Sequence, residues 1–343
     1  MRKLLQDNVS LSEVETILAT VEAGNELSFP SDAYNGFFAC IAMSRHAYRW
    51  ATIPVIKAAQ KEKFIDLPPE LELPWSFLRQ HYGVTSQGGN CTSNYFYNFD
   101  ARENLVYQIN CSSTETIRSA EYHFAHMFPV MEKLALPIYH DIVKSIISFE
   151  QGQRDKCLHF LKSINTQLRL PLKVFYDTLV DSKIPRSVWL SYVQGFQGWA
   201  AGEIIDGKYV EYDGLSGNQL PLFQVVDAFI GLDRYLNEEN VHRYMPLSQR
   251  KLTTSLRQHS FRRKAKEDGD SEIEAEMLKI VKQLRVFRLA HRARARPYLS
   301  TDAPERLIMT AGKSILESST VKNIKAAIDF LDAMLVKRLR ETL

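Results

Sequence analysis

The chain has 343 residues, of which 45% are hydrophobic and 24% charged, so it holds enough apolar material for a sizeable core. Because single cores stop growing at roughly 250–300 residues, this length favours a large domain with a smaller one. The 43 basic and 40 acidic residues leave a net charge of only +3, which gives no reason to expect a nucleic-acid partner.

The cysteines and the N-terminus give no sign of secretion or of a membrane. The four cysteines are widely spread and form no CxxC pair, so neither a zinc site nor a disulfide framework is expected. The N-terminus becomes polar at once, and no stretch approaches the roughly 18 apolar residues that a bilayer span needs. We therefore expect a cytoplasmic protein with no membrane partner, either a monomer or a homodimer.

The first third of the chain mixes one helical pattern with irregular sequence. Residues 33–60 predict a helix. Three prolines within 67–75 predict extended connecting chain, because proline lacks a backbone donor and disfavours helix before it. Residues 82–114 are rich in Gly, Ser, Asn and Thr and predict a loop with at most one strand. We expect a small, partly irregular N-terminal domain over 1–110 and a large helical domain over 111–343.

Helical patterns return after residue 114. Residues 115–150 predict a long helix that Pro129 and Pro137 should kink or divide. A loop over 202–221 that contains Asp206-Gly207 and Asp213-Gly214, with a short hairpin between these two pairs, is expected before the next apolar helix. Further helices are predicted over 154–182, 185–200, 222–236 and after Pro246. The predicted fold class is all-α.

Residues 272–296 carry the most informative helical pattern, with Asp270 or Ser271 as its predicted N-cap. Apolar residues recur every three or four positions, which predicts one buried helix face that ends at His291. Its members are Ile273, Met277, Ile280, Leu284, Phe287 and His291. A hydrogen-bonded core histidine is the ordinary explanation of such a position.

The arginines around this histidine leave several interpretations open. Five arginines occur between residues 285 and 296. They suit the two anionic propionates of a haem whose iron is bound by His291. A solvated helix end and a nucleic-acid patch are the alternatives, although no nucleic-acid motif accompanies the run.

Four segments, in this order along the chain, resemble the indoleamine 2,3-dioxygenase family. They are Pro185 to Trp199, Gly214 to Asp227 with Gly231, Arg243-Tyr244-Met245-Pro246, and Leu284 to His291 with Tyr298-Leu299. The likeness covers roughly residues 110–300. It implies an all-α fold with a small N-terminal domain and a large helical domain that binds haem b.

The resemblance also implies roles for individual residues. It makes His291 the iron ligand, with Asp227 and Arg288 as a cofactor-binding pair beside it. It assigns a catalytic role above the iron to Ser119. It implies that the substrate is contacted by Trp189, Ser216 and Gly217. Thr310-Ala311-Gly312 resembles the family's mobile loop that closes the site.

One departure from the family concerns the substrate. Val193 stands where the family has the arginine that binds the substrate carboxylate, so Arg118, Arg186 or another residue would have to supply this contact. The resemblance implies a haem-dependent oxygenase that takes a small aromatic substrate and O2 and inserts oxygen across the indole C2–C3 bond. The alternatives are a diverged haem enzyme that rearranges or monooxygenates an aromatic amino acid, and a non-catalytic haem-binding or purely helical protein.

Overall fold

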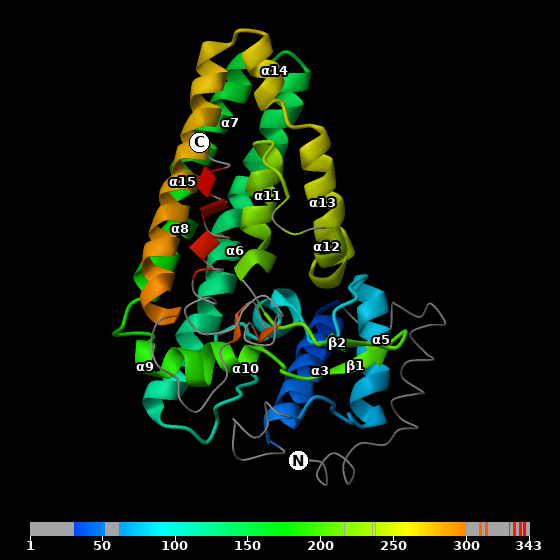
Figure 1. The fold of residues 1–343 in the computed structure, drawn as a ribbon. Helices are drawn as coiled ribbons and strands as arrows, with labels where there is room; N and C mark the ends of the chain where they lie inside the picture. Colours follow the sequence, from blue (N-terminus) through cyan, green and yellow to red (C-terminus); the bar gives the residue numbers. More distant parts are fainter. Residues whose placement is uncertain are drawn as a thin grey trace.

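The computed structural model describes residues 31–51, 62–215, 217–234, 236 and 238–299, together with short pieces between 309 and 340. Within them the protein is almost entirely helical, which confirms the all-α prediction (Figure 1). The strands there form two short hairpins. No helix in these ranges is both long and apolar enough to cross a membrane.

Helices of different lengths form a bundle over most of the molecule's length (Figure 1). They are α6 (Glu115–Glu150), α7 (Arg154–Gln167), α8 (Arg169–Thr178), α11 (Pro221–Phe229), α12 (Glu238–Tyr244), α13 (Leu247–Gln258), α14 (Arg262–Glu267) and α15 (Ser271–Leu299). Helix α6 packs against α7, α8 and α11, and α15 packs against α7. The bundle therefore brings α8, α11 and α15, which are far apart in sequence, around a shared interior.

Helix α6 runs for 36 residues without division, although Pro129 and Pro137 lie inside it. The prediction that the prolines might divide it was therefore wrong on this point. Each proline removes one backbone hydrogen bond. The buried side chains of Ala135, Ile138 and Ile142 along the α7 and α8 contact keep the helix together, because packing supplies most helical stability in proteins.

The proline-rich stretch at 67–75 is not extended chain, as the sequence had predicted. It enters helix α5 (Pro69–Tyr82), in which Pro69 occupies the first turn and Pro74 lies further inside. Proline is well tolerated in a first turn, where its missing N–H would have had no helical partner. Leu71, Trp75 and Leu78 form the buried face of α5.

The glycine- and asparagine-rich segment after α5 contains a short π-helix, η2 (Thr92–Phe96), where at most a strand was expected. The loop predicted over 202–221 forms a hairpin, but earlier than expected, because β1 (Gly202–Ile205) and β2 (Lys208–Glu211) flank Asp206-Gly207 instead of lying between it and Asp213-Gly214. Its turn residues Asp206 and Gly207 have φ angles of 50° and 74°. Positive φ at both central positions is what a tight hairpin with an Asp-Gly turn requires.

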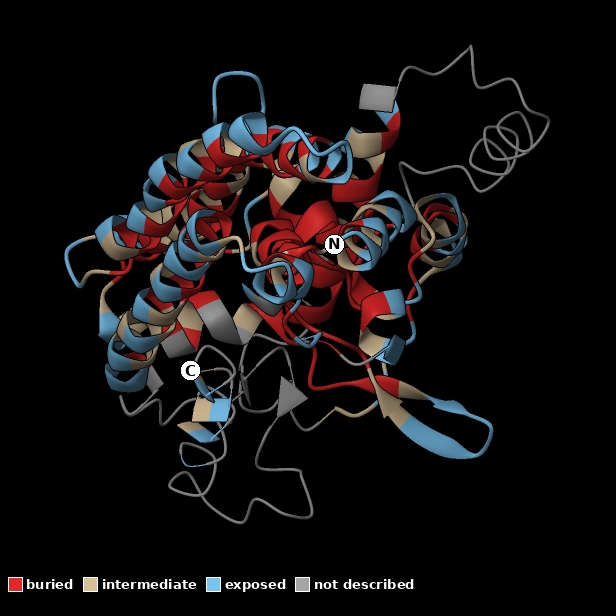
Figure 2. Ribbon diagram, turned by 90° about the horizontal axis from the view of Figure 1, so that it is seen from above, coloured by how far each residue is buried: buried red, intermediate tan, exposed pale blue. Residues whose placement is uncertain are grey.

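Apart from a minor cluster around α12, two large buried clusters make up most of the interior. The larger cluster fills the bundle, and the smaller one joins α3 (Ser31–Ala51) and α5 to the chain around the hairpin. Figure 2 shows the buried residues concentrated along the inner faces of the helices. Trp199 and Tyr212 belong to the smaller cluster with Phe38 and Trp75, so later chain packs on the N-terminal helices. The boundary near residue 110 stays a prediction.

Candidate functional site

Helix α15 presents its apolar face to the bundle as its spacing predicts. Asp270 caps its N-terminus, because Oδ1 accepts a hydrogen bond of 3.1 Å from the backbone N–H of Ile273. The five apolar members of the face, from Ile273 to Phe287, are buried, and His291 follows them with its side chain partly buried. The periodic pattern thus placed His291 correctly at the end of this face.

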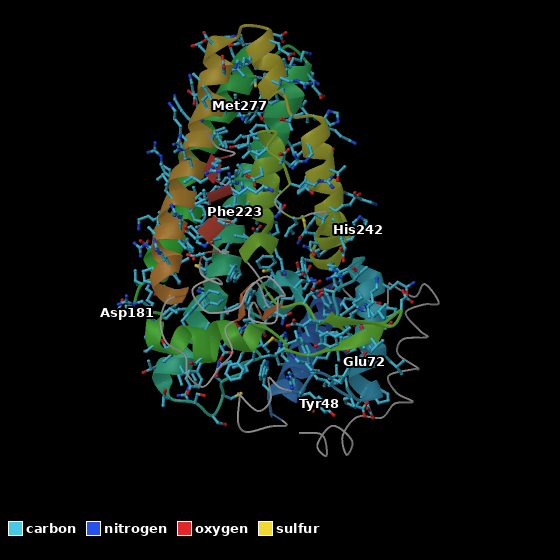
Figure 3. All side chains as sticks on the ribbon, viewed as in Figure 1. Tyr48, Glu72, Asp181, Phe223, His242 and Met277 are labelled. Carbon is cyan, nitrogen blue, oxygen red and sulfur yellow. The ribbon has the colours of Figure 1, made fainter. Side chains whose placement is uncertain are left out.

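Two phenylalanine rings, from α8 and α15, pack against the imidazole of His291. The Phe175 ring of α8 meets it edge-on at 5.1 Å, and the Phe287 ring lies nearly parallel to it at 5.9 Å. Phe287 stacks in turn on Phe223, which projects from α11 toward α15 (Figure 3). Desolvation among these rings lowers the pKa of His291 to about 4. The imidazole is therefore neutral near pH 7, with a ring nitrogen available as a ligand.

No hydrogen bond joins the His291 ring to another residue in the described part of the chain. A hydrogen-bonded core histidine, the ordinary explanation from sequence, therefore finds no support there. A polar ring in apolar surroundings without a partner is costly unless a ligand or water satisfies it. This is the first feature of the region that points to a bound group.

Arg288, one turn before His291, pairs with Asp227 of α11. Its Nη2 lies 2.6 Å from Oδ1 and 2.9 Å from Oδ2, and the two side chains are 10% and 5% exposed. The neighbouring arginines also have protein partners, since Arg292 pairs with Asp332 and Arg294 donates to the Leu179 carbonyl. The arginine run is therefore held within the protein at several points, which disfavours a nucleic-acid patch.

A row of aromatic rings connects η2, α6, η3 (Trp189–Gln194) and α15. Successive rings in it, Tyr95, Phe128, Phe124, Trp189 and Tyr298, have centroids 4.7–6.4 Å apart. The hydroxyl of Tyr95 and Nε1 of Trp189 are both buried without a hydrogen-bond partner in the described structure. Sequence reasoning missed Tyr95, Phe124 and Phe128. Their only sequence signal is the four-residue spacing of the two phenylalanines on α6.

The remaining predicted site residues differ in how close they come to this row. A Cβ added at Gly217 would lie 3.9 Å from the Phe128 ring, so Gly217 adjoins the row. Ser119 lies partly exposed near the start of α6, at the helical spacing of His123 and His126 rather than of Phe128. His126 contacts Glu103 at 3.2 Å, which marks that face as surface. Ser216 lies outside the described residues.

Neither arginine proposed to replace the one missing at Val193 lies in the interior. Val193 is 1% exposed and belongs to the main core. Arg118 pairs with Glu115 at 2.6 Å, and Arg186 pairs with Asp181 at 3.2 Å, both on the surface. Val193 thus lies in the apolar core, whereas the two predicted substitutes form exposed ion pairs.

The predicted closing loop is described only in part. Met309–Thr310 (β3) and Lys313–Ser314 (β4) form a hairpin that packs against η3, the segment that carries Trp189. Ala311 and Gly312 lie outside the described residues. The position of β3 shows that the chain after α15 returns to the aromatic row.

Together these elements define a helical protein with a neutral histidine on an aromatic wall, a buried Arg–Asp pair beside it and a second row of aromatic rings. A model of the indoleamine 2,3-dioxygenase family matches residues 37–328, which is most of the chain. The protein therefore belongs to the indoleamine 2,3-dioxygenase family, and the resemblance found in its sequence is confirmed. No curated protein matches the chain.

Proposed function

We propose that the protein is a haem-dependent oxygenase that acts on tryptophan or a related indole or aromatic amino-acid derivative. Its reaction would insert O2 across the C2–C3 bond of the indole ring. Family membership supports the reaction class. The observation that carries the proposal is the neutral imidazole of His291 between Phe175 and Phe287, which forms no hydrogen bond to any of the described residues.

The residues around His291 fit a haem b group. A neutral imidazole is the form that binds iron, and the phenylalanine rings offer a flat apolar surface to a planar macrocycle. His291 would hold the iron. Arg288 would offset the charge of a propionate, with Asp227 fixing the guanidinium in place.

Haem would supply the activation of O2, and the side chains would bind and orient the substrate. Trp189 would pack against the substrate ring and present its unpaired Nε1–H to a substrate acceptor. Gly217 would admit the substrate beside Phe128, because any larger side chain would take up that space. Ser119 and Ser216 would offer hydroxyl groups to the substrate, a role that Ser119→Ala and Ser216→Ala test through turnover and substrate affinity.

The first test is the ultraviolet–visible spectrum of protein expressed with ample haem precursor, compared with His291→Ala. We expect a Soret band and a histidine-type ferrous–CO spectrum that the substitution weakens or alters. His291→Gln is a useful companion, because it keeps the volume while removing the imidazole. Identical spectra for the wild type and both variants would exclude His291 as the iron ligand.

A diverged haem enzyme of specialised metabolism is the second candidate function. The apolar surroundings of Val193 and the surface positions of Arg118 and Arg186 favour it, because a substrate carboxylate lacks its expected partner there. Product mass separates the two functions. A gain of two oxygen atoms supports dioxygenation, whereas a gain of one or a rearranged isomer supports the second candidate. Haem binding with no oxygen consumption would indicate a non-catalytic protein.

A further inference from the structure

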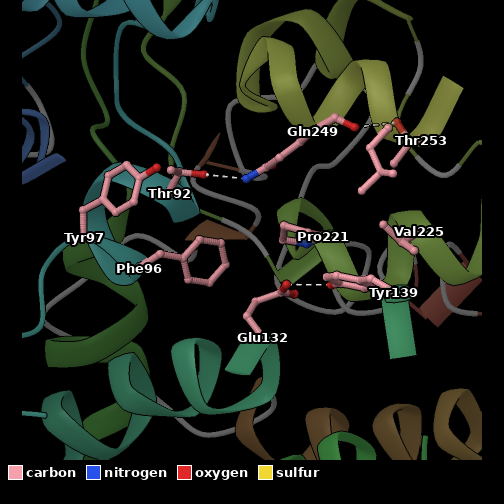
Figure 4. A pocket seen from close by; sticks show the side chains of 10 residues that line it. Thr92, Phe96, Tyr97, Glu132, Tyr139, Pro221, Val225, Gln249 and Thr253 are labelled. Atoms are coloured by element: carbon pink, nitrogen blue, oxygen red, sulfur yellow. Dashed lines mark hydrogen bonds between the residues drawn. The ribbon is translucent and has the colours of Figure 1, made fainter. Parts of the chain in front are cut away.

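A pocket of about 290 Å³ lies beside α11 (Figure 4). Its walls come from η2, α6, α11 and α13. Val225 of α11 lines the pocket, whereas Phe223 and Asp227, two residues away on either side, face α15. Residues two apart on a helix point in nearly opposite directions. The pocket and the His291 region are therefore separate sites that share one helix.

Several polar side chains of the pocket form hydrogen bonds within the protein. The Glu132 carboxylate accepts hydrogen bonds from the Tyr139 hydroxyl at 2.6 Å and from the Leu222 N–H at 2.8 Å. The Gln249 amide donates Nε2 to the Thr92 hydroxyl at 3.3 Å. The Thr253 hydroxyl donates to a backbone carbonyl of its own helix. Among these groups, the Glu132 carboxylate and the Gln249 amide oxygen retain acceptor capacity for a ligand.

Two of these acceptors stand out. Oε1 of Gln249 is buried and has no hydrogen-bond partner in the described structure. The Glu132 carboxylate retains lone pairs beyond its two bonds, and burial raises its pKa to about 7. None of the lining side chains is a lysine, arginine or histidine. The pocket is therefore suited to a donor group with positive charge.

The rest of the lining is apolar. Phe96, Pro221, Val225 and Leu252 surround the space beside Glu132 and Gln249. A volume of about 290 Å³ is at the lower limit of small-molecule sites, so it suits one ring with a short chain. We propose that this pocket is a second ligand site, separate from His291, that binds a small amine carrying an aromatic ring.

In the bound state the ammonium group lies between Glu132 and Oε1 of Gln249, and the ring lies against Phe96 and Leu252. The ammonium satisfies the unpaired amide oxygen and compensates a carboxylate that burial otherwise disfavours. The site needs no haem, so its test is independent of the proposed oxygenase function.

Calorimetric titration of the full chain with 2-phenylethylamine tests the proposal, with phenylacetate as a probe of similar shape and opposite charge. We expect the amine to bind at least about tenfold more tightly, because a second carboxylate beside Glu132 is repelled. Haem-free wild type and His291→Ala should bind the amine as the haem-loaded protein does. Undetectable binding of the amine, equal binding of both probes, or loss of binding in His291→Ala would overturn the proposal.

Substitutions on α13 test whether the probe binds within the pocket. Leu252→Trp fills the space and should abolish binding, whereas Thr254→Trp, on the exposed side of the same helix, should leave it unchanged. Gln249→Leu should weaken binding about tenfold through the lost acceptor. Glu132→Gln should weaken it as well, but Glu132 also caps α11, so Gln249→Leu gives the cleaner result. Wild-type affinity in Leu252→Trp would show that the amine binds elsewhere.

Discussion

Arg288 and Asp227 join α15 to α11 one helical turn before His291, with both carboxylate oxygens within 2.9 Å of one guanidinium nitrogen. The two side chains are almost completely buried. Removing one member of a buried charge pair is costly, because the remaining charge loses much of its compensation. The same contact fixes the spacing between Phe223 and Phe287, the stacked rings beside His291.

Asp227→Ala should lower the free energy of unfolding of the haem-free protein by about 3–5 kcal/mol, because it removes the buried carboxylate that pairs with Arg288. Urea denaturation measures this. The double variant Asp227→Ala/Arg288→Met should recover much of the loss, since it removes both charges. Arg154→Ala, which breaks an exposed pair with Asp270, is the control and should cost much less. Equal losses in the single and double variants would contradict an electrostatic role for the pair.

The buried carboxyl of Glu132 should make stability depend on pH. Its pKa is raised from 4.5 to about 7 in the folded protein, so the native state holds a proton that the unfolded state has lost over this range. Stability should therefore fall as pH rises from about 4.5 to 7, by roughly 3 kcal/mol at most, and stay level above that. Glu132→Gln should remove this slope. Denaturation curves at several pH values measure it, and an unchanged slope in the variant would assign the effect to another group.

Gly88 lies where the N-terminal segment meets the chain after the β1–β2 hairpin. A Cβ at this position would lie 1.6 Å from the carbonyl oxygen of Asp213 and 2.5 Å from Nε1 of Trp199. Gly88→Ala should therefore lower stability by at least about 1–3 kcal/mol, because backbone must move. Gly36→Ala, on an open face of α3, should instead raise it by about 0.5–1 kcal/mol. Thermal unfolding compares the two, and similar shifts would show that the contact at Gly88 relaxes freely.

The sequence predicted local features that depend on regular spacing or on one turn. The apolar face of α15 is of this kind, because its periodicity is present in neighbouring residues. The Asp-Gly pairs predicted a hairpin in the right loop, but its strands flank Asp206-Gly207 instead of lying between the two pairs. Helix α5 was missed because prolines usually end helices. Pro69 instead starts one, and the burial of Trp75 against Phe38 outweighs the cost of Pro74.

Much of the candidate site depends on contacts that no local pattern contains. The carboxylate of Glu132 meets the backbone of Leu222 across 90 residues, and the ring of Tyr95 stacks on Phe128 from a segment expected to be loop. The proximity of His291 to Phe175 likewise depends on how α8 packs on α15. Periodicity could identify His291 as inward-facing, but only the tertiary structure shows which rings surround it.

Trp189 provides a direct test of the aromatic row as a substrate-binding surface. Its Nε1 is buried without a partner, so Trp189→Phe removes an unsatisfied donor and should change folding stability little. If the indole N–H donates a hydrogen bond to the substrate, the same change should weaken substrate affinity about fivefold to tenfold. This factor corresponds to the net free energy of one hydrogen bond. Affinity is measured by the substrate-induced change in the Soret band of the haem-loaded protein.

Trp75→Phe is the matched control for this measurement. Nε1 of Trp75 is also buried and unpaired, but the residue belongs to the smaller cluster with Phe38, away from the row. Its substitution removes the same chemical group and should leave substrate affinity unchanged. Equal effects of the two substitutions would mean that the loss at Trp189 reflects general loosening of the fold. An effect confined to Trp189 would make its N–H a hydrogen-bond donor to the substrate.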